Sequence, residues 1–135
     1  MNGRYKNGLA MLACVALGAF CSEALHGQPT PPAYLIGQIE VSDPAGYAKE
    51  YLPKAREIIK AHGGQLVAAA GAAASSQVVG IDGVPPKRVI IYRYPSMEAL
   101  LAWRNDPAYV QVRQVGEKYA KYHTFAVEGA PDSPR

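Results

Sequence analysis

The stretch Lys87-Arg88-Val89-Ile90-Ile91-Tyr92-Arg93-Tyr94 is the clearest strand in the sequence. Its centre is almost continuously apolar and rich in β-branched and aromatic residues, which is typical of a strand covered on both sides. Alternation along a strand places Val89, Ile91 and Arg93 on one face. The same alternation places Ile90, Tyr92 and Tyr94 on the other face.

Two helices and a closing strand are predicted after this stretch. Pro95-Ser96 ends the strand, and Ser96 is a good N-cap for a helix that runs to about Trp103. Asp106-Pro107 then provides a second cap and a proline suited to the first helical position. Apolar and aromatic residues follow at helical spacing, namely Tyr109, Val112, Val115 and Tyr119. Residues 123–128 form the last predicted strand.

The residues before the central strand predict a matching first half. Residues 34–41 alternate as a strand, with Tyr34, Ile36, Gln38 and Glu40 on one face and Leu35, Ile39 and Val41 on the other. Asp43-Pro44 caps a helix whose apolar face carries Tyr47, Tyr51, Ala55, Ile58, Ile59 and His62.

Pro53 interrupts this helix, so we expect a kink or a break there. Gly63-Gly64 ends it through a left-handed cap. Residues 65–70 are a second strand and residues 77–81 are strand-like. Asp82-Gly83 marks a turn.

The order of strands and helices predicts an α+β, ferredoxin-like βαββαβ fold. Such a fold is a four-stranded antiparallel sheet with two helices on one face, which leaves the other face bare. A second copy of the chain is the simplest cover for that face, so we expect a homodimer.

Composition and charge exclude several classes of protein. The chain has 135 residues, 49% of them apolar and 19% charged, with a net charge of +3. This is enough for one domain, and it is unlike a disordered chain or a disulfide scaffold. The weak, unclustered positive charge predicts no nucleic-acid partner.

The N-terminus has the pattern of an export signal. Arg4 and Lys6 precede an uncharged run of 12 residues, Leu9–Phe20, which is too short to span a bilayer. We therefore predict a signal peptide at 1–24, a proline-rich linker at 25–32, a domain at 33–130 and a tail at 131–135. The mature chain would be periplasmic or secreted and would have no stable membrane span.

Two alternatives for the N-terminus stay open. One is a buried N-terminal helix, although the run lacks the polar face that such a helix needs. The other is a lipoprotein modified at Cys21, where bulky Phe20 stands in place of the small residue expected before the modified cysteine. Cleavage after Ala24 would remove both cysteines, Cys14 and Cys21, and with them any thiol chemistry.

The domain resembles the family called domain of unknown function 1330. The resemblance covers residues 33–129. The residues that carry it are Asp43-Pro44, Tyr47, Tyr51, Gly63-Gly64, Lys87–Ile91, Tyr94-Pro95-Ser96, Ala99, Ala102-Trp103, Asp106–Tyr109 and Val127–Gly129. It implies a dimeric α/β barrel, in which the sheets of two ferredoxin-like units face each other and each unit encloses a cavity. The wider superfamily includes cofactor-free monooxygenases, muconolactone isomerases and haem enzymes such as chlorite dismutase.

Three positions depart from the family pattern. The family often has glutamate at the position of Arg93 and arginine at the positions of Ala69 and Gly116. Since these charged positions are altered, the resemblance leaves three options open: a different ligand, an anionic ligand, or none.

A few side chains are candidates for chemistry. His62 and His123 are candidate general acids or bases; each is also compatible with a surface position. Arg93 is a candidate anchor for a carboxylate or phenolate, or else one half of an ion pair with Glu40 or Glu128. Tyr47, Tyr51, Trp103 and Tyr109 are candidates for an aromatic ligand-binding wall, or else core side chains with solvated hydroxyls.

Three functions compete on this evidence. The first is an exported domain that binds a small organic molecule, anionic among the options, in a dimer cavity. The second is a structural or interaction dimer without a ligand. The third is an enzyme of the cofactor-free monooxygenase or isomerase kind. We predict no cofactor, since no set of ligands at metal-binding spacing and no dinucleotide or phosphate-binding motif is present; a haem or metal protein is the remaining alternative.

Overall fold

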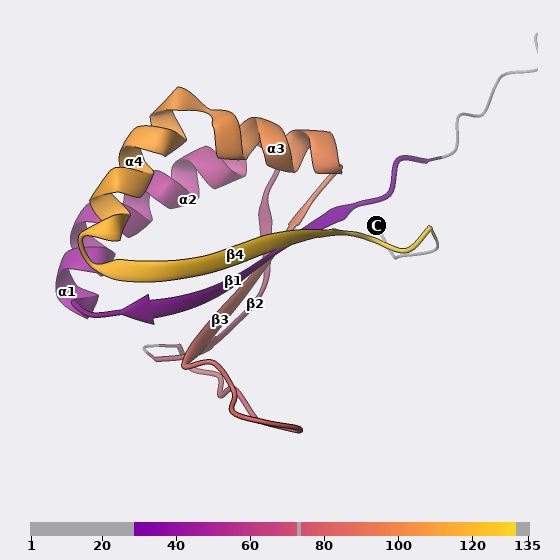
Figure 1. Cartoon of the computed structure of the whole chain (residues 1–135). Helices are drawn as coiled ribbons and strands as arrows, with labels where there is room; N and C mark the ends of the chain where they lie inside the picture. The colour runs from indigo at the N-terminus through magenta and orange to yellow at the C-terminus, as the bar shows by residue number, and fades with distance from the viewer. Residues whose placement is uncertain (1–28, 73, 132–135) are drawn as a thin grey trace, which may run out of the picture.

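The computed structural model describes residues 29–72 and 74–131. The predicted signal peptide, residues 25–28 of the linker and residues 132–135 of the tail lie outside this range. Four strands form one antiparallel sheet in the order β2-β3-β1-β4, and the helices all lie on one of its faces (Figure 1). The strands are β1 (Ala33–Val41), β2 (Gln65–Gly71), β3 (Arg88–Tyr94) and β4 (Ala120–Glu128). The predicted ferredoxin-like α+β fold is confirmed.

Strand β1 sets the two faces of the sheet because it lies between β3 and β4. Ile36 pairs with Ile91 of β3 and with Phe125 of β4, so these three side chains share the face without helices, which we call the open face. Leu35 pairs with Tyr92 and Ala126 on the helix face. The alternation predicted for β1 and β3 is therefore confirmed.

The first helical stretch begins at α1 (Pro44–Gly46), where the Asp43 carboxylate accepts a hydrogen bond from the Gly46 N–H at 3.0 Å. A π-helical turn, η1 (Tyr47–Tyr51), precedes α2 (Leu52–Ala61). The Leu52 N–H bonds five residues back, to the Tyr47 carbonyl. Pro53 has no N–H to continue the ladder, so the predicted interruption takes the form of this wide turn.

The C-terminus of α2 is closed by a Schellman motif. Gly63 has φ +79°, its N–H bonds the Lys60 carbonyl, and the Gly64 N–H bonds the Ile59 carbonyl. These bonds satisfy the last carbonyls of the helix. The predicted left-handed cap at this glycine pair is confirmed.

The second helical pair follows its predicted caps. The Ser96 hydroxyl accepts from the Ala99 N–H at the start of α3 (Met97–Asn105), and Asp106 accepts from the Ala108 N–H at the start of α4 (Pro107–Glu117). Each cap satisfies a backbone donor that the helix leaves without a partner.

The core lies between the helices and the helix face of the sheet. Two clusters of buried residues fill it: Ala33, Leu35, Ile59, Tyr94, Leu100, Trp103 and Tyr109 in one, and Ile39, Tyr47, Tyr51, Ala55 and Ala120 in the other. No helix among the described residues has the length and apolar character needed to cross a membrane.

The connection between β2 and β3 differs from the sequence prediction. Residues 77–81 are not a strand, because they pair with no other strand of the described chain. Gly80 interrupts residues 77–81, and Gly83 and the pair Pro85-Pro86 follow shortly after them. Prolines offer no N–H to a strand ladder. The connection projects below the sheet (Figure 1) and exposes Val79, Ile81 and Val84.

Gly71 lies at the start of this connection, at a position where only glycine fits. It has φ +87°, and a Cβ there would meet the backbone of Lys87 and Arg88, which cannot move aside like a flexible side chain. Gly83 also has a positive φ, +75°, but a Cβ there would meet nothing within 4 Å.

We expect Gly71→Ala to destabilise the fold more than Gly83→Ala. A left-handed alanine costs about 1–2 kcal/mol at either position, and only Gly71→Ala adds a backbone clash. Urea unfolding of both variants measures the two free energies. Equal losses would contradict this account of Gly71.

Candidate functional site

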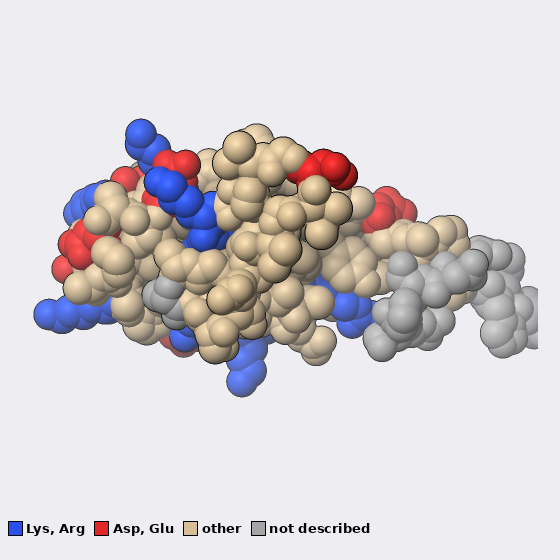
Figure 2. All heavy atoms as spheres, turned by 90° about the horizontal axis from the view of Figure 1, so that it is seen from below, with Lys and Arg blue, Asp and Glu red and all other residues tan. Residues whose placement is uncertain are grey.

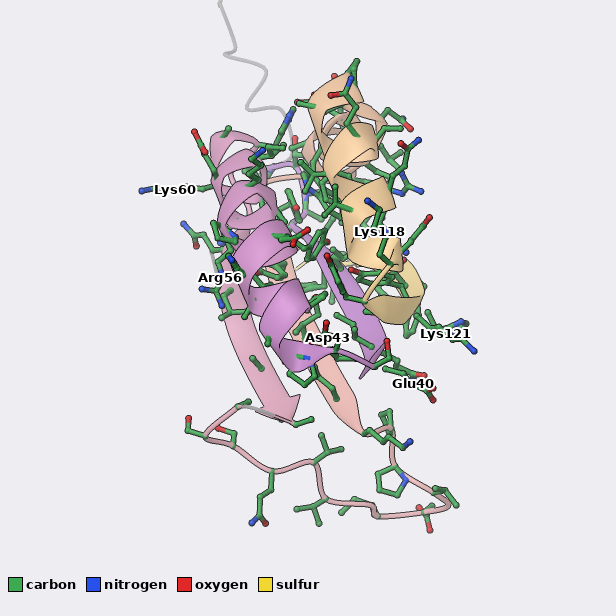
Figure 3. The ribbon with its side chains drawn as sticks, turned by 90° about the vertical axis from the view of Figure 1, so that its left-hand side faces the viewer. Glu40, Asp43, Arg56, Lys60, Lys118 and Lys121 are labelled. Atoms are coloured by element: carbon green, nitrogen blue, oxygen red, sulfur yellow. The ribbon has the colours of Figure 1, made fainter. Side chains whose placement is uncertain are left out.

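A groove of about 440 Å³ lies at one end of the open face. Its floor comes from β1 and β4, where Gln38 pairs with His123 and Glu40 with Lys121. Its wall comes from Val84, Pro86 and Lys87 at the end of the β2–β3 connection. Figure 3 shows Glu40 and Lys121 at this end of the sheet, with the connection passing below them.

The groove carries more positive than negative charge. Lys87 and Lys121 supply two ammonium groups, and Glu40 supplies one carboxylate. The Gln38 amide and the His123 imidazole add further hydrogen-bonding groups. An adjoining hollow of about 480 Å³ shares Glu40, Lys87 and Lys121 and adds Glu117 and Lys118. This arrangement suits an anion that also needs hydrogen bonds.

The remainder of the open face is largely apolar. Phe125 and Val127 of β4 are 43% and 47% exposed, while Ile36 and Ile91 are half-buried. Seen from below, this side of the molecule is mostly uncharged, with charged side chains mainly around its margin (Figure 2). The groove therefore adjoins an uncovered apolar surface.

Arg93 is half-buried on the open face, opposite Tyr34 of β1 and Gln65 of β2. It does not line the groove. Tyr34 lies four residues along β1 from Gln38, which is about 13 Å at the usual rise of a strand. The role of Arg93 as a ligand anchor stays a prediction.

The two candidate histidines lie on opposite sides of the sheet. His123 lines the groove, and its ring lies 5.9 Å from that of Phe125. His62, at the end of α2, is 2.8 Å from the Asp106 carboxylate at the start of α4. The structure thus brings only His123 to the groove.

The four aromatic candidates are buried in the core. Tyr47, Tyr51, Trp103 and Tyr109 are 2–5% exposed on the helix side of the sheet. The hydroxyls of Tyr51 and Tyr109 are 3.3 Å apart, and the rings of Trp103 and Tyr109 are 4.2 Å apart. The sheet therefore separates them from Arg93, and their role in ligand binding stays a prediction.

Burial disfavours the ionisation of Tyr47 and Tyr51. It raises the pKa of Tyr51 and of Tyr47 above the ordinary value for tyrosine, because a phenolate is poorly solvated there. The Arg113 guanidinium lies 3.6 Å from the centroid of the Tyr122 ring, a cation–π contact that closes the cluster. These hydroxyls are neutral hydrogen-bonding groups.

Gln38, Lys87 and Lys121 are not among the site residues predicted from the sequence. Alternation placed Gln38 and Glu40 on one face, but it does not show which residues of β4 lie beside them. That register appears only in the folded sheet. Among the described residues, no group of three or more His, Cys, Asp or Glu side chains is placed to hold a metal ion.

Comparisons with known proteins place the fold. The sequence model of the family described as "Domain of unknown function (DUF1330)" matches residues 32–130. No curated protein matches the chain.

Three solved structures share the fold at low identity. The methylated RPA0582 protein is 16% identical, with TM-score 0.53, over 75% of this chain and 82% of that one. The RPA0582 protein of unknown function from Rhodopseudomonas palustris is 17% identical, with TM-score 0.50, over 71% and 82%. SnoaB, a cofactor-independent oxygenase from Streptomyces nogalater, is 9% identical, with TM-score 0.53, over 78% and 100%.

The pair of His62 and Asp106 makes a pH-dependent contribution to stability. The His62 hydrogen bond, followed by that of the Ala108 N–H, lowers the pKa of Asp106. A lowered pKa in the folded state means that ionised Asp106 stabilises the fold above the unfolded-state pKa of about 3.9. This contribution is lost as the pH falls through the folded-state pKa.

We expect Asp106→Asn to lower stability at pH 7, with a difference from wild type that shrinks as the pH falls below about 3.9. Asparagine keeps the N-cap, so the variant removes the charge and its bond to His62. Urea unfolding between pH 7 and pH 3 measures this, with Asp82→Asn in the exposed connection as control. A difference independent of pH would contradict the assignment.

Proposed function

Since the chain belongs to the DUF1330 family, we propose from its own geometry that it is an exported homodimer that binds a small organic anion between two open sheet faces. The groove carries this proposal, because it combines a volume suited to a small ligand with Lys87, Lys121 and His123. Ligand sites usually have volumes of about 300–1,000 Å³ and a few convergent polar groups.

The apolar open face supports the dimer. Full burial of one large apolar side chain contributes about 1.5–3 kcal/mol, and Phe125 and Val127 are each close to half exposed in a single chain. In a twofold-symmetric dimer, each copy would cover the open face of the other. The same residues would then be buried in both copies. The groove would then open into the space between the two sheets.

Export rests on the N-terminal sequence. Arg4 and Lys6 before the apolar run Leu9–Phe20 have the order of a signal peptide. An exported binding domain would meet its ligand outside the cytoplasm.

We expect Phe125→Asp to convert the dimer into a monomer. A charge in the centre of an apolar interface is poorly solvated and has no partner. The matched control is Val110→Asp on α4, since Val110 is 40% exposed on the helix side. Light scattering should give twice the mass of the purified chain for wild type and Val110→Asp, and the single mass for Phe125→Asp. A monomeric wild-type chain would contradict the dimer.

We also expect a small organic acid to co-purify with the dimer and to be lost from Lys121→Met. This substitution keeps most of the side-chain volume and removes one ammonium group from the groove. Mass spectrometry of small molecules released from the purified chain detects the ligand, with Lys60→Met on α2 as control. An acid retained by both Lys121→Met and the Phe125→Asp monomer would contradict the groove as its site.

A further inference from the structure

A third hollow, which we call the cleft, lies on the helix side of the sheet within a single chain. This cleft has a volume of about 240 Å³ and opens between the first helical stretch and the end of the sheet where β3 begins. Its charged side chains are Arg56 of α2 and Arg88 of β3. The residues that line it are Val41, Pro44, Tyr47, Ala48, Leu52, Arg56, Ala72 and Arg88. It shares no lining residue with the groove, and it shares Val41 and Ala72 with the adjoining hollow.

Arg88 is held in place by one hydrogen bond and one aromatic contact. Alternation along β3 places it on the helix face, with Ile90 and Tyr92. Its Nη1 donates to the Ala72 carbonyl at 3.0 Å, and its Cζ lies 5.8 Å from the centroid of the Tyr47 ring. Its Nε is buried and has no hydrogen-bond partner within the described part of the chain. The buried Nε is out of reach of a ligand, so Arg88 acts on the cleft through the charge of its guanidinium group.

The cleft is positively charged and carries no compensating acid. No aspartate or glutamate lines it. Burial raises the pKa of Tyr92, and the positive charges of Arg56 and Arg88 oppose that rise, so both guanidinium groups act on the same region. Figure 3 shows Arg56 on α2, on the side where β2 runs.

We propose that this cleft binds a small carboxylate with a compact apolar body. The carboxylate would pair with the part of the Arg88 guanidinium group that lines the cleft, with Arg56 as the second positive charge. The body of the ligand would pack against Val41, Pro44 and Leu52. The volume equals about eight water molecules at roughly 30 Å³ each, which limits the ligand to about ten non-hydrogen atoms.

The apolar walls select against inorganic anions. Phosphate is strongly hydrated, and Val41, Pro44 and Leu52 offer no hydrogen bonds in place of its water. A planar acid such as benzoate exchanges only its carboxylate hydration for the two guanidinium groups. Its apolar ring gains from leaving water.

Calorimetric titration of the whole chain with three probes tests the proposal: benzoate, neutral benzamide and inorganic phosphate. We expect saturable binding of benzoate alone. Arg88→Met should weaken it about tenfold or more, the usual effect of losing a hydrogen bond to a charged group. Arg56→Met should weaken it by a smaller factor, and Arg104→Met on α3 should leave it unchanged.

Two controls separate loss of binding from loss of folding and from binding in the groove. Circular dichroism checks the folding of Arg88→Met, since this variant also loses the bond to Ala72; if it does not fold, Arg56→Met decides. The Phe125→Asp chain should keep benzoate binding even as a monomer, because the cleft lies within one chain. This separates the cleft from the proposed groove.

Three results would overturn the proposal. The first is the absence of saturable benzoate binding at millimolar concentration. The second is equal binding of benzamide, which would show that charge plays no part. The third is weakening by Lys121→Met but not by Arg56→Met or Arg88→Met, which would place the benzoate in the groove.

Discussion

The whole molecule depends on a sheet that its own helices cover on one face only. Because side chains alternate along a strand, every residue of β1 and β3 belongs either to the core or to the uncovered face. Leu35 and Tyr92 pack beneath the helices, whereas Ile36 and Ile91 lie on the open face. Strands β1, β3 and β4 carry large apolar side chains on that open face, and Phe125 and Val127 stay close to half exposed in a single chain. The fold is thus complete on one side and incomplete on the other.

This division also separates the possible sites for chemistry. Arg88 and Arg93 lie on one strand, but they are five residues apart, and this odd separation places them on opposite faces. The helix face carries the tyrosine cluster and the cleft with Arg56 and Arg88. The open face carries Arg93, His123 and the lysines of the groove. The sheet separates the groups on one face from those on the other, so the proposed dimer cavity and the proposed cleft within one chain can be tested independently.

Most of the fold could be predicted from the sequence because its signals are local. The caps at Asp43, Ser96 and Asp106 and the glycine pair at 63–64 each act over a few residues. Residues 77–81 were predicted wrongly because their β-branched residues resemble a strand, yet no strand is available to pair with them. The groove was not predictable, since it depends on which residues of β4 lie beside β1. Arg88 was missed although alternation already placed it with Tyr92.

Direct detection of contacts between chains tests the central claim, that a second copy covers the open face. Isotope-filtered NMR on a mixture of labelled and unlabelled chains detects only contacts between copies. The account predicts such contacts for Ile36, Ile91, Phe125 and Val127, and none for Val110 on α4. Contacts between copies at Val110 instead, or the absence of contacts at all four open-face residues, would contradict it.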